Sequence, residues 1–146
     1  LGALFILARL LCNLFDGMVA VEYGKGSPSG GLYNELPDRI SDVITIMALG
    51  VAIDQRELAL WASLLAVMTA YIRTLSTHVG AEPDFSGPMA KQQRMFSIMA
   101  ACLFSNALPA FADVTFLVCL MVIAAGSAIT CIRRLFSALH SLEAKA

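Results

Sequence analysis

Polar residues recur at helical spacing in two neighbouring stretches of a mostly apolar sequence. The first set occupies positions i, i+3, i+4 and i+7, and it consists of Asn13, Asp16, Gly17 and Ala20. The second set occupies positions i, i+4 and i+8, and it consists of Asn34, Asp38 and Asp42. Each spacing places its residues on one face of a helix. Two adjacent antiparallel helices would bring the faces together, so the sequence predicts a small volume rich in carboxylate and amide oxygens.

Such a group of oxygen atoms predicts a site for a divalent cation. Neighbouring carboxylates repel one another unless cations lie among them. Oxygen ligands suit Mg²⁺, Mn²⁺ or Ca²⁺ rather than zinc or copper, and Gly17 and Ala20 leave room for a ligand to approach the backbone. The alternative is that Asp16 and Asp38 only mark solvated helix ends, where charges cost little. Asp42 is harder to explain in that way, because it lies one turn deeper and an apolar run follows it.

The composition indicates which kind of protein must position these residues. The chain has 146 residues, of which 58% are hydrophobic and 14% charged, whereas a soluble domain has roughly 45–50% apolar and about 25% charged residues. We therefore expect one membrane-embedded domain over residues 1–146. Ten basic and eleven acidic residues leave no basic excess, which argues against a nucleic-acid partner. The chain begins at Leu1 rather than at methionine, so we expect a truncated N-terminus.

Apolar segments of the chain predict an all-α, polytopic transmembrane helix bundle. Five segments are long enough, or nearly so, to cross a bilayer core of about 30 Å. We expect these spans at residues 1–21, 32–53, 58–72, 95–108 and 114–132. The second span is polar in its first third, so we expect it to stand half out of the hydrocarbon. The alternation typical of membrane β-strands is absent from the sequence.

The basic residues predict the orientation of these spans. If the spans alternate in direction, the loops 23–31 and 73–94 and the C-terminal tail share one side, which carries most of the Lys and Arg residues. The positive-inside bias makes that side cytoplasmic. We therefore expect an integral protein of the cytoplasmic (inner) membrane whose site faces the cytoplasm.

Three residues of this basic side are candidates for binding phosphate, namely Arg73, Lys91 and Arg94. Lys91 and Arg94 share a helix face near a helix N-terminus, which is a favourable position for an anion. The alternative is that these residues only follow the positive-inside bias or bind anionic lipid. Arg133 and Arg134 directly follow the last span, and we interpret them as anchors at the membrane edge.

The two polar sets also resemble a known signature. The segment Asn13-Leu-Phe-Asp-Gly-Met-Val-Ala20, followed by Asn34-Glu-Leu-Pro-Asp-Arg-Ile-Ser-Asp42, is similar to the D-x-x-D-G-x-x-A-R and G-x-x-x-D-x-x-x-D motifs of the CDP-alcohol phosphatidyltransferases. The residues that coincide are Asp16, Gly17, Ala20, Asp38 and Asp42. Asn13 replaces the first aspartate, Val21 the arginine and Asn34 the glycine, and the stretch between the motifs is a few residues longer than usual.

The resemblance implies an enzyme of phospholipid synthesis that moves a substituted phosphate from a CDP-linked donor to a small alcohol and releases CMP. The donor would be CDP-diacylglycerol or a similar CDP-alcohol, and the cofactor Mg²⁺ or Mn²⁺. The implied metal ligands are Asn13, Asp16, Asp38 and Asp42, with Asp42 also the general base. The implied nucleotide-binding residues are Asp16, Gly17, Ala20 and Asn34. The family further implies a homodimer and six helices, so this chain would lack the first.

Two other functions fit the same residues. Asn13 and Val21 are compatible with a degenerate homologue that binds CDP-lipid, or a partner enzyme, without turnover. A small cation transporter could use the same carboxylates. It is less favoured, because the carboxylates cluster at one membrane edge whereas transporter sites usually lie at the midplane.

Overall fold

The computed structural model describes residues 2, 4–9, 11, 12, 15 and 28–144, with the side chains of residues 28–31 and 34 left out. The described part of the chain contains helices and no strand. Residues 4–9 are helical, and the elements that follow are α2 (Pro28–Ala52), α3 (Arg56–His78), α4 (Lys91–Ala107), the short 3₁₀ helix η1 (Pro109–Phe111) and α5 (Ala112–Glu143). The predicted all-helical bundle is confirmed.

Turn residues set most of the helix boundaries. Asp54 has a positive φ of 54° and makes the tight turn between α2 and α3, where Gln55 N donates to Gly50 O over 2.7 Å. Pro109 ends α4, because the residue before a proline avoids helical backbone angles. The end of α5 differs from the prediction, since the helix continues to Glu143 rather than stopping at residue 132. Charged residues did not end this helix, because its buried stripe continues through Arg134 and Ala138.

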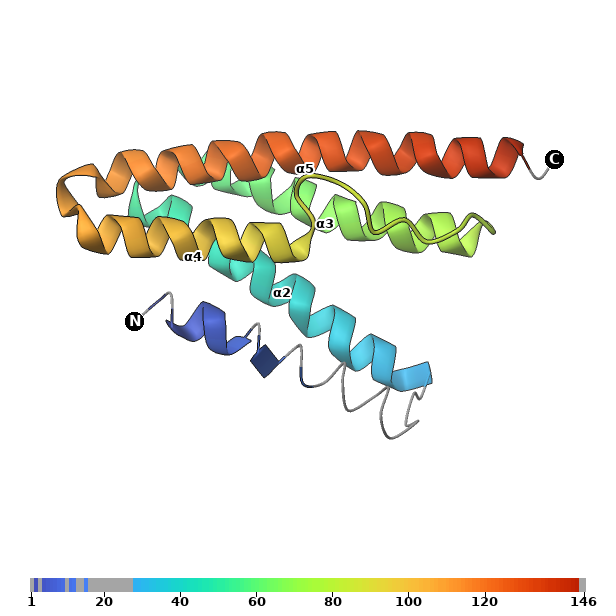
Figure 1. Ribbon diagram of the computed structural model, residues 1–146, viewed down its shortest axis with the longest axis horizontal. Helices are drawn as coiled ribbons and strands as arrows, with labels where there is room; N and C mark the ends of the chain where they lie inside the picture. Colours follow the sequence, from blue (N-terminus) through green and yellow to red (C-terminus); the bar gives the residue numbers. More distant parts are fainter. Residues whose placement is uncertain (1, 3, 10, 13–14, 16–27, 145–146) are drawn as a thin grey trace.

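The helices run alternately up and down, and α5 lies along α3 and α4 (Figure 1). α3 packs between α2 and α5. Its buried stripe consists of small residues, which let helix backbones approach closely: Ala59, Ala62, Ser63, Ala66, Thr69, Ala70 and Ser76. One close approach is at Gly50, where an added Cβ would overlap Ala59 Cβ. This arrangement brings the start of α2, the end of α3, the start of α4 and the second half of α5 to the same end of the bundle.

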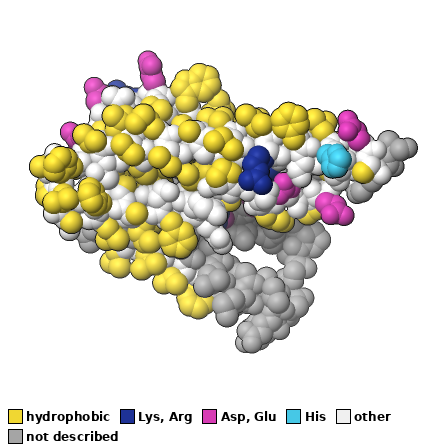
Figure 2. Space-filling model, turned by 45° about the horizontal axis from the view of Figure 1, so that its top comes forward, with side chains coloured by type: hydrophobic (Ala, Val, Ile, Leu, Met, Phe, Trp, Pro, Cys, Tyr) yellow, Lys and Arg dark blue, Asp and Glu magenta, His cyan; other side chains and the backbone are white. Residues whose placement is uncertain are grey.

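The outer surface of the bundle is strongly apolar. Large hydrophobic side chains are exposed on every described helix, for example Leu60 and Trp61 on α3 and Phe136 on α5. Figure 2 shows hydrophobic side chains over much of the visible face, with charged side chains near both ends of the bundle and a histidine toward the end where α5 finishes. An apolar surface of this extent is typical of a protein that faces lipid.

Two of the described helical segments are long and apolar enough to cross a membrane, residues Arg56–His78 and Pro109–Glu143. The other helices do not meet this standard. α2 carries Glu35, Asp38, Arg39 and Asp42 in its length, and α4 has only 17 residues. The first part of α2, which was expected to be polar, is the part that carries the candidate site residues Asp38 and Asp42.

Candidate active site

Asp38 and Asp42 lie one turn apart on the buried side of α2. Asp38 is 9% exposed and Asp42 is 1% exposed. Ile46, one further turn along the same stripe, is fully buried in the core. The apolar residues of this stripe pack against the neighbouring helices. Because the two carboxylates lie on the same face of α2, this packing places them in the interior as well.

Three arginine side chains surround the carboxylate of Asp42. Arg9 Nη2 donates to Asp42 Oδ1 over 2.7 Å, and Arg94 Nη2 donates to Asp42 Oδ2 over 3.0 Å. Arg39, on the same helix, lies 3.7 Å from Oδ2. Both oxygens of this buried carboxylate are thus paired with guanidinium groups, which offset the cost of burying its charge.

Two basic side chains also contact the carboxylate of Asp38. Lys91 Nζ donates to Asp38 Oδ2. Arg9 Nη2 lies 3.4 Å from Asp38 Oδ1 and 3.0 Å from the Asp38 carbonyl oxygen. Arg9 therefore bridges the two aspartates from the N-terminal helical residues.

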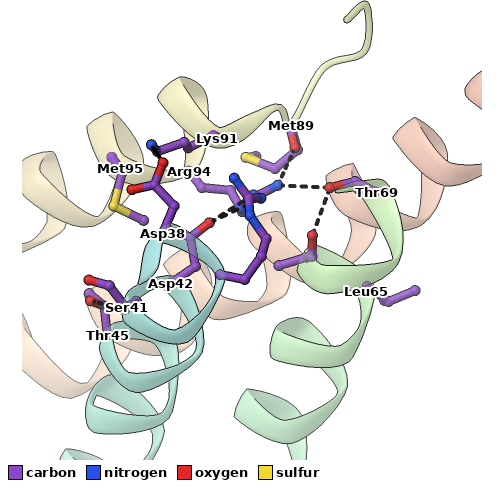
Figure 3. Close-up of polar contacts among 12 residues, drawn as sticks. Asp38, Ser41, Asp42, Thr45, Leu65, Thr69, Met89, Lys91, Arg94 and Met95 are labelled. Atoms are coloured by element: carbon purple, nitrogen blue, oxygen red, sulfur yellow. Dashed lines mark hydrogen bonds and ion pairs between the residues drawn. The ribbon is translucent and has the colours of Figure 1, made fainter. Parts of the chain in front are cut away.

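Arg94 is entirely buried, at 0% exposure. Besides Asp42, it donates through Nη1 to Met89 O over 2.9 Å and to Thr69 Oγ1 over 3.3 Å. Figure 3 shows these side chains meeting between α2, α3 and the start of α4. Arg94 thus connects the carboxylate on α2 to two other segments of the bundle.

Arg73 lies at the same end of the bundle but on a different partner. Its Nη2 donates to Glu35 Oε1 over 2.7 Å, and its guanidinium lies 5.1 Å from the centre of the Phe85 ring. Glu35 is also 3.4 Å from Arg39 Nε. The i, i+4 spacing of Glu35 and Arg39 predicts a solvated ion pair on one helix. In the structure, Glu35 also pairs with Arg73 of α3, and Arg39 lies near Asp42, so a series of ion pairs links α3 to Asp42.

The loop 79–90 runs from the end of α3 back to the start of α4 and is hydrogen-bonded to α5 (Figure 1). Met89 N donates to Thr130 Oγ1 over 3.1 Å, and Gly87, with a φ of 132°, leaves no room for a Cβ against Thr130. Hydrogen bonds from Ser86 lower the pKa of Asp84 below its ordinary value. This contribution to stability is therefore present above that value and is lost as the pH falls below it.

Arg134 is not a membrane-edge anchor, in contrast to the expectation from the sequence. Its side chain is buried, with Nε donating to Ser86 O over 3.0 Å and Nη1 to Thr69 O over 2.7 Å. The expectation was wrong because the helix continues past residue 132 and turns Arg134 toward α3. Arg133, its neighbour, is exposed as expected.

Loss of Arg134 should loosen the loop. Arg134→Met removes two hydrogen bonds from a charged donor, each worth about 1.5–3 kcal/mol, so local opening becomes more frequent. We expect chymotrypsin to cleave after the exposed Phe85 at least roughly tenfold faster in Arg134→Met than in the unmodified protein, because the loss of one such hydrogen bond alone accounts for a factor of that size. Arg133→Met is the matched control and should leave the rate unchanged. Equal cleavage rates in both variants would show that Arg134 does not hold the loop.

Part of the predicted site lies outside the described residues. This applies to Asn13, Asp16, Gly17 and Ala20, and Asn34 belongs to α2 without a described side chain. Within the described part, no group of three His, Cys, Asp or Glu side chains is arranged to hold a metal ion. Asp38 and Asp42 nevertheless supply the carboxylate oxygens that Mg²⁺ and Mn²⁺ prefer, and each carboxylate has about four lone-pair sites for its partners. The donor chemistry of these two residues fits a divalent cation.

No role for Arg9 was predicted from the sequence. The available signal was a charged residue within an apolar helix, because such residues usually have a functional partner. Its partners could not be identified, since Asp38 and Asp42 lie 29 and 33 residues further along the chain. Only the packing of the helices brings them together.

Comparison with known proteins places the chain in a family. The model of the CDP-alcohol phosphatidyltransferase family matches residues 1–132, which is most of the chain and includes both polar sets. No curated protein and no solved structure matches the chain significantly. Members of this family carry out phosphatidyl transfer in phospholipid synthesis. With its helical membrane fold and its paired aspartates, the chain belongs to the CDP-alcohol phosphatidyltransferase family.

Proposed function

We propose that this protein transfers a phosphatidyl or similar substituted phosphate group from a CDP-linked donor to an alcohol and releases CMP. The observation that carries the proposal is the pair of buried carboxylates, Asp38 and Asp42, held among basic side chains within the family match. Displacement at phosphorus needs charge neutralisation and an aligned nucleophile more than covalent help from the protein. Here the basic side chains can neutralise charge, and the carboxylate can align the attacking alcohol.

Asp42 is the proposed general base. It accepts the proton of the attacking alcohol as the new oxygen–phosphorus bond forms and CMP leaves. Arg9 donates one hydrogen bond to Oδ1 of Asp42, and Arg94 donates one to Oδ2. Each carboxylate oxygen has a second lone pair, which can accept a proton.

Asp38 is a proposed ligand of Mg²⁺ or Mn²⁺, together with Asn13, Asp16 and Asp42. When bound, the metal would neutralise the developing charge on the diphosphate. Asn13 offers a carbonyl oxygen in place of a carboxylate, which removes one negative charge and should weaken metal binding.

Lys91 and Arg73 are proposed to bind phosphate groups of the substrates. Both side chains are partly exposed, at 23%, and both are flexible enough to exchange a carboxylate partner for a phosphate. Asp16, Gly17, Ala20 and Asn34 are proposed to contact the nucleotide. Arg94 was grouped with Lys91 in the sequence analysis, but its burial suggests a different task, described below.

The location of the site suits an amphipathic donor such as CDP-diacylglycerol. Its acyl chains can lie against the exposed apolar side chains of the bundle, while its nucleotide reaches the charged end. We propose that this end faces the cytoplasm, and that the protein works as a homodimer in the inner membrane.

The proposed function is tested by CMP release from the purified, full-length protein in lipid nanodiscs. CDP-diacylglycerol is supplied with Mg²⁺ and with glycerol phosphate, inositol phosphate, serine or a lipid alcohol in turn, and a CDP-aminoalcohol replaces the donor in a parallel series. We expect CMP and a new phospholipid with one acceptor. Binding of CDP-diacylglycerol without CMP release from any combination would instead support the degenerate homologue.

A further inference from the structure

The contacts of Arg94 differ from those of the other basic residues at this end. Its side chain is the largest that is fully buried in the described part of the chain. A residue that binds substrate phosphate must be reached by the substrate, as the partly exposed Lys91 and Arg73 can be. Arg94 instead has three protein partners on three different segments, Asp42 on α2, Thr69 on α3 and Met89 in the loop.

Because the guanidinium group of Arg94 is planar, these contacts fix its orientation relative to Asp42. Nη1 is held by Met89 O and Thr69 Oγ1, so the plane of the group is set from the side away from α2. Nη2 belongs to the same rigid fork and therefore points at Asp42 Oδ2. Nε has no hydrogen-bond partner in the described structure, so Nη1 and Nη2 alone set this orientation.

Thr69 is itself oriented for this task. Its hydroxyl donates to Ala66 O over 2.7 Å, one turn earlier in α3. The proton is therefore used within α3, and a lone pair of Oγ1 remains to accept from Arg94. A threonine hydroxyl with its proton committed in this way acts as an acceptor at a fixed position.

We propose that Arg94 is a positioning residue, which holds the Asp42 carboxylate in the orientation needed for proton transfer, with Thr69 and Met89 O holding Arg94. The inference rests on the proposed function, in which Asp42 is the base. Arg94 does not touch substrate and acts only through Asp42. The two basic residues at the start of α4 then have different tasks: Lys91, which is partly exposed, pairs with Asp38, and the fully buried Arg94 fixes Asp42.

Steady-state kinetics of Arg94→Lys and Thr69→Val test this proposal in the full-length protein in nanodiscs. Lysine keeps the charge but cannot span three separated acceptors. Misplacement of a reacting group by about 1 Å can cost roughly 100-fold in rate, so we expect kcat to fall roughly 100-fold in Arg94→Lys while KM for both substrates stays within about twofold. Thr69→Val removes one hydrogen bond and should lower kcat about fivefold. Thr74→Val is the matched control, because Thr74 is an exposed residue whose hydroxyl, within the described part of the chain, donates to Ala70 O of its own helix and to no residue of the site.

Each alternative gives a different result. A raised KM for donor or acceptor with unchanged kcat in Arg94→Lys would assign Arg94 to phosphate binding and overturn the proposal. Unchanged kinetics in Arg94→Lys would overturn it as well. If Arg94→Lys does not yield folded protein by size-exclusion chromatography, Thr69→Val decides, and kcat equal to that of Thr74→Val overturns the proposal. Absence of CMP release by the unmodified protein overturns the proposed function itself, independently of either substitution.

Discussion

Asp42→Asn should lower kcat for CMP release by on the order of 10²–10⁴-fold, the range that a positioned general base contributes. Asparagine has nearly the same shape as aspartate but no basic oxygen. The substitution also leaves the buried Arg94 without its carboxylate, because Asp42 is 1% exposed and lies 3.0 Å from Arg94. Removing one partner of a buried ion pair typically costs 3–5 kcal/mol, and the retained amide oxygen should hold the loss to about 3 kcal/mol. We therefore expect folded, less stable and nearly inactive protein.

Asp54→Asn provides the matched control for this substitution. The Asp54 side chain is 88% exposed, lies in the turn at the other end of α2, and pairs only with the exposed Arg56 in the described structure. Asparagine tolerates the positive φ at this position, so activity and the thermal midpoint should stay unchanged. Activity of Asp42→Asn equal to that of Asp54→Asn would remove Asp42 from the chemistry.

Chelation of divalent metal should abolish CMP release, and Mg²⁺ or Mn²⁺ should restore it. Asp38→Asn removes one of the proposed ligand charges, so we expect the Mg²⁺ concentration for half-maximal activity to rise at least about tenfold. Binding of Mn²⁺, followed directly by electron paramagnetic resonance, should weaken by a similar factor. This second measurement separates a loss of metal affinity from a loss of activity with another cause.

Glu82→Gln is the matched control for Asp38→Asn, because Glu82 is an exposed carboxylate in the loop 79–90. It should leave the Mg²⁺ requirement unchanged. CMP release that persists after chelation would contradict the proposed role of Asp38. Donor binding that persists after chelation, combined with no CMP release under any condition, would favour the degenerate homologue.

The sequence predicted the helices and the face of α2 that carries the site. Long apolar segments favour helices in a membrane, because every backbone hydrogen bond must be satisfied within the segment. The spacing of Asp38 and Asp42 placed them one turn apart, and this follows from helix geometry alone. The signature around them also indicated the family, because its residues lie close together in the chain and can be recognised without knowledge of the packing.

Helix ends and basic residues were harder to predict. The sequence predicts that the last helix ends at residue 132, because a pair of arginines follows an uncharged run. The helix in fact continues to Glu143, because Arg134 can donate hydrogen bonds to two backbone carbonyl oxygens of the bundle, those of Ser86 and Thr69. A charged side chain can be buried when it has such partners, and those partners come from segments far away in the sequence.

The sequence by itself therefore determined the membrane character of this protein, its helices, its family and the position of its carboxylates on α2. Local features settle these points: apolar length, helical period and a short motif. Only the tertiary structure decided which cations meet those carboxylates, because the contacts of Arg9 and Arg94 with Asp42 depend on how separate helices pack. The same packing separated the buried Arg94 from the accessible Lys91, although both lie on one face of the same helix.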